Sequence, residues 1–376
     1  MSKNILFLIE SLRDGGSERS ISNVAQELSN KYNTILVVAN KQKIDYSFNG
    51  KIIEIKEFIS HNPLKRLIGI KKLKTIKKKN NIDIAISYLT AYNLYNVLSK
   101  YKDKIYISIR NHLSTKKEGL LAFIGTIYSN KKADKIICCS KSVETDQIKN
   151  YHAKKEKTKV IENFTYDKEK QNIKKDNIII TVGRLTKHKE QEHIIKAMTI
   201  VTKKRKDAKL LILGRGNYKD YLEQLIKEYN LENNIKMIDY TKEVDKYLNK
   251  SKIFVLASDY EGFSNALLEA MSSSLPVIVT ASPGGNCEIL IEEEYKKEIN
   301  KPIHGKYGIL IPSFINEHNT KKITKNEKIL AKEILNLLSN KKDYNYYKKM
   351  SKERSNHYNK NIIIKKWITI IEEDNI

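Results

Sequence analysis

Two glutamates, Glu261 and Glu269, flank a point at which the chain could bind an anion. The short apolar run at 253–257 predicts a buried strand, and Ser264 or Asn265 can cap the helix that follows. Free N–H groups at such a helix N-terminus bind anions, particularly at the carboxyl end of a parallel strand. Carboxylates would repel the anion itself, so these two suit hydroxyl groups on either side of it, such as those of sugars and riboses. The alternative is an ordinary strand, loop and helix with a solvated glutamate.

The two glutamates belong to a longer pattern, which consists of Glu261-Gly262-Phe263, Glu269, Leu275–Thr280 and Gly284-Gly285-x-x-Glu288-Ile289. This pattern resembles the donor-site signature of retaining glycosyltransferases of family 4. The resemblance implies the GT-B fold, an α/β architecture of two facing Rossmann-like domains with a cleft between them. It also implies that Glu261 holds hydroxyl groups of the transferred sugar, that Glu269 holds the ribose, and that the donor is bound by Gly262, Phe263, Ser264 and Asn265.

Two cations follow another predicted strand, at 177–182, in the segment Gly183-Arg-Leu-Thr-Lys-His-Lys189. Arg184 offers a bidentate fork and Lys189 a compact charge, a combination that suits a diphosphate. By themselves the two residues would be read as solvated surface charge. Their spacing is similar to the family's Gly-Arg-Leu-x-x-x-Lys, which implies contacts with the donor diphosphate, although Glu190 stands where the family has glycine. The next predicted strand ends at Gly214, a position that the resemblance assigns to nucleotide binding through the backbone.

The first half of the chain offers fewer candidates. Gly15 and Gly16 follow a predicted strand at 4–9, and glycines let backbone N–H groups approach a ligand closely. A plain tight turn is the other interpretation, but the resemblance places this turn opposite the donor diphosphate. His112 follows the predicted strand 105–109. A lone histidine is more often structural, whereas the resemblance puts it near the transferred sugar as a catalytic-site residue together with Glu261.

The elements that must position these residues alternate between short apolar runs and helical patterns, as in two doubly wound α/β domains. A length of 376 residues fits two domains. We expect an acceptor-side domain over 1–168 and a nucleotide-sugar domain over 169–355, joined by a lysine-rich linker. A C-terminal helix at 356–376, with Trp367 as a packing residue, is expected to cross back onto the first domain.

The net positive charge is concentrated in the first half, because acidic residues are fewer there. Residues 1–175 carry 35 Lys and Arg against 17 Asp and Glu, a net +18 of the chain's +26. The run 64–79 combines lysines with an apolar stripe, so it predicts either a helix at an anionic membrane surface or a surface helix packed on the sheet. A second apolar helical patch at 120–128 is flanked by Lys116-Lys117 and Lys131-Lys132.

Composition also excludes some classes of protein. The three cysteines, two of them adjacent, form no disulfide framework and no metal-ligand spacing, and no apolar run approaches the ~20 residues of a membrane-spanning helix. A reducing cytosol is therefore expected. No recognised nucleic-acid-binding motif accompanies the positive charge, although a basic nucleic-acid-binding protein is an alternative.

The resemblance implies a retaining glycosyltransferase that requires no metal or other cofactor and uses a nucleotide sugar, which we expect to be a UDP-sugar. The resemblance implies an N-acetylhexosamine or hexose as the transferred sugar and a lipid-linked acceptor, namely a growing saccharide on undecaprenyl diphosphate. The enzyme would bind peripherally to the inner face of the cytoplasmic membrane. A soluble acceptor is an alternative, and so is an epimerase or phosphorylase on the same scaffold.

Overall fold

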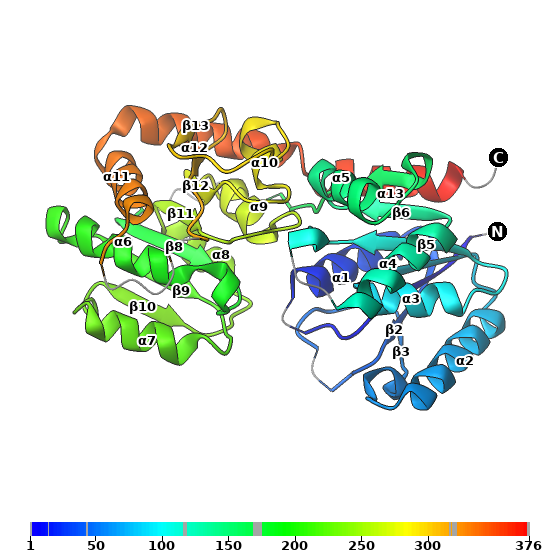
Figure 1. Ribbon diagram of the computed structural model, residues 1–376. Helices are drawn as coiled ribbons and strands as arrows, with labels where there is room; N and C mark the ends of the chain where they lie inside the picture. Colours follow the sequence, from blue (N-terminus) through cyan, green and yellow to red (C-terminus); the bar gives the residue numbers. More distant parts are fainter. Residues whose placement is uncertain are drawn as a thin grey trace. The chain divides into compact units, whose positions relative to one another are not determined.

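The computed structural model describes residues 2–13, 15–42, 44–115, 119–167, 175–315, 317 and 322–373. The chain forms two compact units, the first made of Met1–Asn163 and Asn361–Ile376 and the second of Phe164–Lys360 (Figure 1). The predicted boundary between residues 168 and 169 lies outside the described residues, as do Lys116 and Lys117.

The first unit is built on a seven-stranded parallel sheet in the order β3-β2-β1-β4-β5-β6-β7. Its strands are β1 (Asn4–Ile9), β2 (Asn33–Val38), β3 (Lys51–Glu54), β4 (Ile84–Tyr88), β5 (Lys104–Ile109), β6 (Lys135–Cys138) and β7 (Thr158–Val160). The inner strands are almost wholly apolar and buried, as expected for a parallel sheet covered on both faces. The helices that connect them are α1 (Gly16–Leu28), α2 (Pro63–Lys79), α3 (Thr90–Leu98), α4 (Leu120–Lys132) and α5 (Lys141–Asn150).

The C-terminal helix α13 (Lys360–Glu372) packs on this first sheet, as predicted. Tyr106 of β5 donates a hydrogen bond through its hydroxyl to the carbonyl of Ile370, 3.0 Å away. Trp367 is buried and is therefore a packing residue.

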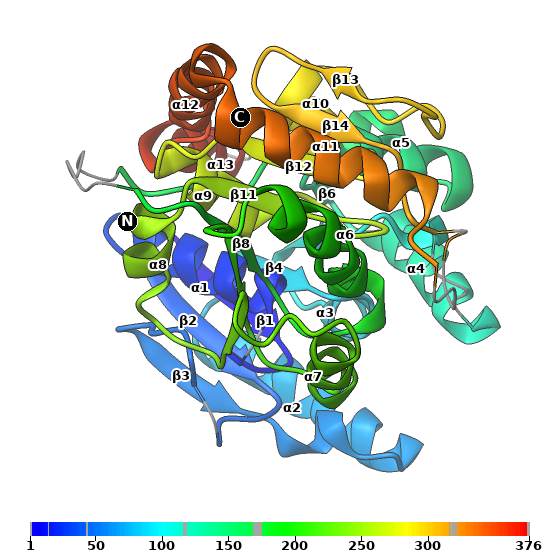
Figure 2. The ribbon, with the colours of Figure 1, turned by 90° about the vertical axis from the view of Figure 1, so that its left-hand side faces the viewer.

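The second unit has its own seven-stranded sheet, in the order β10-β9-β8-β11-β12-β14-β13, with only β13 antiparallel. The strands are β8 (Ile178–Val182), β9 (Lys209–Leu213), β10 (Ile235–Ile238), β11 (Ile253–Leu256), β12 (Val277–Thr280), β13 (Ile303–His304) and β14 (Ile309–Ile311). The helices are α6 (Gln191–Lys204), α7 (Lys219–Glu228), α8 (Val244–Lys250), α9 (Asn265–Ser272), α10 (Asn286–Ile291), α11 (Lys325–Ser339) and α12 (Lys341–Asn356). Helices α6 and α11 lie side by side (Figures 1 and 2).

The strand order of each sheet reverses at one place, between β1 and β4 in the first unit and between β8 and β11 in the second. The chain runs outward from these strands in both directions. Ligands of open α/β sheets bind at such topological switch points. The two segments that carry Lys189 and Glu261 follow β8 and β11, and hence meet at the switch point of their sheet.

Helix α2 differs in one respect from what the sequence suggested. The basic run was expected to present all its lysines to solvent or lipid, but the side chain of Lys77 is completely buried and ion-pairs with Asp103 at 2.9 Å. Its ammonium also donates a hydrogen bond to the side-chain oxygen of Asn96. Lys77 lies one helical turn after the buried Leu73, on the face that packs against the rest of the unit.

Candidate functional site

The switch point of the second sheet brings Lys189 and Glu261 together. Lys189 ends the short 3-10 helix η4 (Lys187–Lys189) after β8, and its ammonium ion-pairs with one carboxylate oxygen of Glu261, in the loop after β11. The hydroxyl of Ser258 donates a hydrogen bond of 2.9 Å to the same oxygen. Both side chains of the pair are largely buried, so their attraction is weakly screened by solvent. A cation and an oriented carboxylate thus share one site.

Helix α9 begins beside this pair. Its N-cap is Ser264, whose side chain accepts a hydrogen bond from the backbone N–H of Leu267, and Asn265 is the first helical residue. Of the two capping residues considered, the structure therefore selects Ser264. Gly262 and Phe263 form the loop between Glu261 and this cap, and Phe263 is buried. Glu269 lies one turn further into α9 and is almost completely buried.

Two glycines hold the Glu261 loop in place. Gly284 has a φ of 116°, and a Cβ added to it would lie 1.4 Å from the carbonyl oxygen of Glu261. The backbone N–H of Glu261 donates to the carbonyl of Pro283 at 3.0 Å, and that of Gly285 donates to Gly262 at 2.8 Å. The glycine pair is needed because the two loops touch backbone to backbone. The sequence pattern contained these glycines without showing their role.

A similar close approach explains Gly214. Its φ is 150°, and an added Cβ would lie 1.8 Å from the carbonyl oxygen of Gly183. The loop after β9 can therefore lie against the loop after β8, where the N–H of Leu185 donates to the carbonyl of Arg215 at 2.9 Å. Arg184 is exposed in this loop, and its carbonyl accepts a hydrogen bond from the side chain of Gln191. The structure thus places Arg184, Lys189 and Gly214 on adjoining strand ends.

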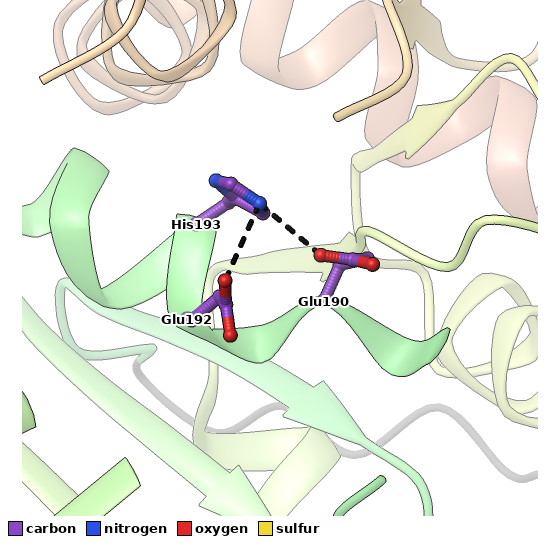
Figure 3. A group of neighbouring side chains, drawn as sticks. All are labelled: Glu190, Glu192 and His193. Atoms are coloured by element: carbon purple, nitrogen blue, oxygen red, sulfur yellow. Dashed lines mark ion pairs between the residues drawn. The ribbon is translucent and has the colours of Figure 1, made fainter. Parts of the chain in front are cut away.

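The sequence analysis did not predict a buried cluster that follows Lys189 directly in the chain. It consists of Glu190, Glu192 and His193, whose carboxylate and imidazole atoms lie within 4.8 Å of one another (Figure 3). The Nε2 atom of His193 is 3.1 Å from Glu190, and its Nδ1 atom is 2.7 Å from Glu327 of α11. The only signal in the sequence was Glu190 at the position where the family pattern has glycine.

The same three side chains have a ligand set that a metal ion could use. A metal would require the ring of His193 to be neutral. Both ring nitrogens instead face carboxylates, which favours the doubly protonated, positively charged ring. The geometry therefore fits a buried ion network at least as well as a metal site.

In the first unit, the sequence candidates lie at the carboxyl ends of its strands. Gly15 is the N-cap of α1, and Gly16 is the first residue of that helix. His112 follows β5, and its Nδ1 atom is 3.8 Å from a carboxylate oxygen of Asp146 and 3.4 Å from the hydroxyl of Ser114. Burial lowers the pKa of His112 although Asp146 opposes the shift. His112 is therefore mainly neutral near pH 7 and able to exchange hydrogen bonds.

Arg110 is a buried residue of this unit that the sequence analysis did not single out. It is buried, and its guanidinium donates hydrogen bonds to the hydroxyl of Ser20, at 3.0 Å, and to the side chain of Asn163. It also lies over the ring of Tyr88, 5.3 Å from the centroid. These contacts connect the end of β5 to the start of α1 and to the segment after β7, so Arg110 fixes the edge that carries His112 and Gly15.

Comparison with known proteins identifies the family to which the chain belongs. The family described as glycosyl transferases group 1 matches residues 163–354, and that described as glycosyltransferase family 4 matches residues 14–167. The chain is a family 4 glycosyltransferase. It is 36% identical to an uncharacterized glycosyltransferase of Methanocaldococcus jannaschii over 72% of each chain.

Further relatives of this glycosyltransferase have more specific names. It is 29% identical to the Campylobacter jejuni N-acetylgalactosamine-N,N'-diacetylbacillosaminyl-diphospho-undecaprenol 4-alpha-N-acetylgalactosaminyltransferase, over 76% of this chain and 83% of that one. Its structure is similar to that of Anabaena HepE in complex with UDP-glucose, with a TM-score of 0.81 at 16% identity over 98% of this chain and 99% of that one. The likeness confirms the predicted GT-B fold.

The family assignment also answers a question that the sequence left open. The protein is an enzyme, which sets aside the reading of its positive charge as that of a nucleic-acid-binding protein. Every helix of the glycosyltransferase within the described ranges is too short or too polar to cross a bilayer.

Proposed function

We propose that this glycosyltransferase transfers a hexose or an N-acetylhexosamine from a UDP-sugar, with retention of anomeric configuration and without a metal, to a lipid-linked saccharide. The observation that carries the proposal is the contact of Lys189 with Glu261 beside the N-terminus of α9. The scissile bond of a nucleotide sugar joins an anionic diphosphate to a ring of hydroxyl groups. A cation and a carboxylate held side by side offer one partner for each of these.

In the proposed reaction the bond between the anomeric carbon and the diphosphate oxygen breaks, and a bond from the same carbon to an acceptor oxygen forms on the same face. The acceptor proton passes to a phosphate oxygen of the donor, so no side-chain nucleophile is needed. Arg184, Lys189 and the first N–H groups of α9 stabilise the negative charge that develops on the diphosphate.

The remaining candidates position the donor and the sugar. Glu261 accepts hydrogen bonds from sugar hydroxyl groups, and its orientation is fixed by Ser258 and by the backbone contact with Pro283. Glu269 accepts from the ribose, while Gly214, Gly262, Phe263, Ser264 and Asn265 shape the loops around the nucleotide. His112, with Gly15 and Gly16, would act from the first unit on the transferred sugar and the acceptor.

The names of relatives support the substrate classes. One Campylobacter jejuni relative acts on a diphospho-undecaprenol saccharide, and a second adds N-acetyl-D-galactosamine to a PP-undecaprenol acceptor. Another relative, from Erwinia amylovora, is an amylovoran biosynthesis glycosyltransferase. Anabaena HepE was solved with UDP-glucose, and the pneumococcal O-GlcNAc transferase GtfA was solved with UDP and GlcNAc.

The surface of the first unit supports a membrane-borne acceptor. Helices α2 and α4 each follow a strand of the parallel sheet, so both begin at its carboxyl edge, the edge that carries His112. Their first turns expose large apolar side chains, up to 86% exposure at Leu121: Leu64, Leu67, Ile68, Leu120, Leu121 and Ile124. Exposed lysines follow on both helices. Apolar side chains flanked by lysines fit the interface of an anionic membrane.

The proposal is tested by incubating the purified enzyme with a panel of UDP-sugars and with either undecaprenyl-diphosphate-linked saccharides or water-soluble analogues that carry a short alkyl chain. We expect transfer of one sugar, an unchanged anomeric configuration by NMR, and full activity in EDTA. Transfer only to acceptors without any lipid would favour the soluble-acceptor alternative. An inverted product or a strict metal requirement would contradict the mechanism.

A further inference from the structure

Arg354 of α12 is a buried cation that the proposed mechanism does not use. Its Nη2 atom donates a hydrogen bond of 2.6 Å to the carbonyl of Glu288, and its Nε atom donates one of 2.9 Å to the carbonyl of Ile289. Both carbonyls belong to the last turn of α10, where a helix offers its own carbonyls no partner. Arg354 therefore caps the C-terminus of α10.

The residue that follows α10 is held by the same guanidinium. Glu292 has a φ of 60°, in the left-handed region that is uncommon for a residue with a side chain. Its carboxylate accepts a hydrogen bond of 2.9 Å from Nη1 of Arg354. Such a backbone conformation persists where surrounding contacts determine it. The contact with Arg354 thus helps to fix the end of α10.

The guanidinium also contacts aromatic rings that lead to the donor site. Arg354 lies over the buried rings of Tyr307 and Tyr358, at 4.8 and 5.1 Å from their centroids. Tyr358 in turn packs edge to face on Phe263, with ring centroids 5.0 Å apart. Phe263 follows Glu261 by two residues. Both kinds of ring contact prefer a particular arrangement, so together they orient the ring of Phe263.

The loop that carries Glu261 therefore has two supports, and both lead to Arg354. The first is the turn that precedes α10, because its backbone is hydrogen-bonded to the loop and it continues directly into the helix that Arg354 caps. The second is the ring of Phe263, which packs on Tyr358. This ring also lies so close to Gly285 that a Cβ added there would be 2.4 Å from a ring carbon.

The backbone of Tyr358 is fixed as well as its ring. The N–H of Thr165 donates a hydrogen bond of 2.9 Å to the carbonyl of Tyr358, and the N–H of Lys360 donates one of 3.1 Å to the carbonyl of Thr165. Thr165 and Asn359 pair as an isolated parallel bridge. Tyr358 can therefore act as a fixed point against which Phe263 packs.

We infer that Arg354 and Tyr358 are positioning residues of the donor site, which hold the Glu261 loop through α10 and through the ring of Phe263. The inference rests on the proposed function, since that function assigns the sugar hydroxyl groups to Glu261. Without these contacts the loop loses both supports, and the carboxylate of Glu261 is no longer held beside Lys189. A displacement of about 1 Å, caused far from the reacting atoms, can lower a rate about a hundredfold.

Tyr358→Ala removes the ring contact, whereas Tyr358→Phe keeps it. We expect the alanine variant to lower kcat by about tenfold to a hundredfold and the phenylalanine variant to stay within about threefold of the wild type. The affinity for UDP should fall much less than kcat, because Glu261 is proposed to bind the sugar. Steady-state kinetics and calorimetric titration measure the two effects, and Tyr358→Leu serves if the alanine variant does not fold.

Arg354→Lys tests the guanidinium. The lysine keeps the positive charge but lacks the planar fork that bonds two carbonyls and faces two rings, so we expect it to lower kcat by about tenfold. Wild-type kcat in this variant would remove Arg354 from the inference.

A merely structural role for Tyr358 would lower stability without this selectivity. Tyr347→Ala is the matched control, because Tyr347 and Tyr358 are both 7% exposed and Tyr347 packs in the hydrophobic core of the unit. It should destabilise the protein in urea but leave kcat of the folded enzyme close to that of the wild type. In a Phe263→Leu background, Tyr358→Ala should lower kcat little further, since residues that act through one contact are not additive. Effects that multiply, or an equal loss of kcat in Tyr347→Ala, would overturn the inference.

A readout without substrate separates this inference from the proposed function. The amides of Glu261 and Gly285 donate the hydrogen bonds that join the loop to the turn before α10. Their hydrogen exchange should be about tenfold faster in Tyr358→Ala than in Tyr358→Phe or Tyr347→Ala. Inactivity of the wild type towards every UDP-sugar, alongside this difference, would remove the proposed function but support the role of Tyr358 in holding the loop. Equal exchange rates in the three variants would overturn that role.

Discussion

Lys189 and Glu261 each depend on the other for their proposed chemistry. The ion pair holds a flexible lysine at one place, and it holds the carboxylate with one oxygen occupied by Lys189 and Ser258. The other carboxylate oxygen of Glu261 can accept a hydrogen bond from a sugar hydroxyl. Arg184 is different, because it is exposed. In the proposed site, the bound donor would order its long side chain. We therefore expect substitutions of the cations and substitutions of the glutamates to have different effects on catalysis and on nucleotide binding.

We predict that Arg184→Ala and Lys189→Ala each lower kcat/KM a hundredfold or more, on the order of 3 kcal/mol for losing one preorganised contact to developing charge. Steady-state kinetics with the UDP-sugar measures this. Lys187→Ala is the control, since Lys187 is an exposed lysine of the same short helix and should stay within about twofold of the wild type. Near-wild-type kinetics of either variant would remove that cation from the donor site.

The two glutamates should separate chemistry from nucleotide binding. We predict that Glu261→Gln strongly lowers kcat while the affinity for UDP stays largely intact, because in the proposed site this side chain binds the sugar and not the nucleotide. Glu269→Ala should instead weaken UDP binding, by about 1–3 kcal/mol for a buried acceptor that pairs with the ligand. Calorimetric titration with UDP checks both. An equal loss of UDP affinity in the two variants would contradict this division of roles.

At the scale of elements, α2 shows how one helix serves two purposes. Its second half packs on the unit through Leu73 and Lys77, whereas its first half exposes Leu64, Leu67 and Ile68. The Lys77–Asp103 pair is completely buried and also bonded to Asn96. Such pairs contribute little net stability when intact, but removal of one partner leaves a buried charge without compensation.

We predict that Lys77→Ala destabilises the protein by about 3–5 kcal/mol, because Asp103 would remain buried and unpaired. Lys78→Ala, on the exposed side of the same turn, should change the free energy of unfolding by less than about 0.5 kcal/mol. Urea unfolding of both variants measures the difference. Equal stability of the two would mean that water reaches Asp103 and that the ion pair is not dry.

The elements show which features could be predicted from the sequence. The strands β8 and β11 and the turns after them could be predicted, since each is a local pattern of apolar residues, glycine and a helix cap. The burial of Lys77 could not, because it depends on Asp103 and Asn96 from elsewhere in the unit. The cluster around His193 could not be predicted for the same reason, since Glu327 lies on a helix more than a hundred residues away in the chain. The resemblance supplied Lys189 and Glu261 separately, whereas only the sheet order shows that they meet.

Most of the net positive charge of the whole molecule, +18 of +26, lies in residues 1–175, and that asymmetry motivates the last prediction. We expect reversible binding to anionic liposomes through the first unit. Lys71, Lys74, Lys78 and Lys79 are exposed on α2, whereas Lys72 ion-pairs with Glu57 and Lys77 is buried. The four exposed lysines are therefore the ones to change together to glutamine. At about 1 kcal/mol each near an anionic leaflet, their loss should weaken binding by about 4 kcal/mol, or roughly a thousandfold.

Sedimentation with liposomes at low and physiological salt measures this effect. The matched control changes four exposed lysines of the second unit, Lys203, Lys204, Lys206 and Lys227, and removes the same net charge. Only the α2 variant should stay in the supernatant, and it should still act on a water-soluble acceptor. A third variant, Leu120→Ser with Leu121→Ser and Ile124→Ser, should lose the part of binding that persists at high salt, because apolar contact is not screened. Equal losses of liposome binding in the α2 variant and its control would show that net charge alone accounts for the binding. If the wild type did not bind even at low salt, a soluble acceptor would be favoured.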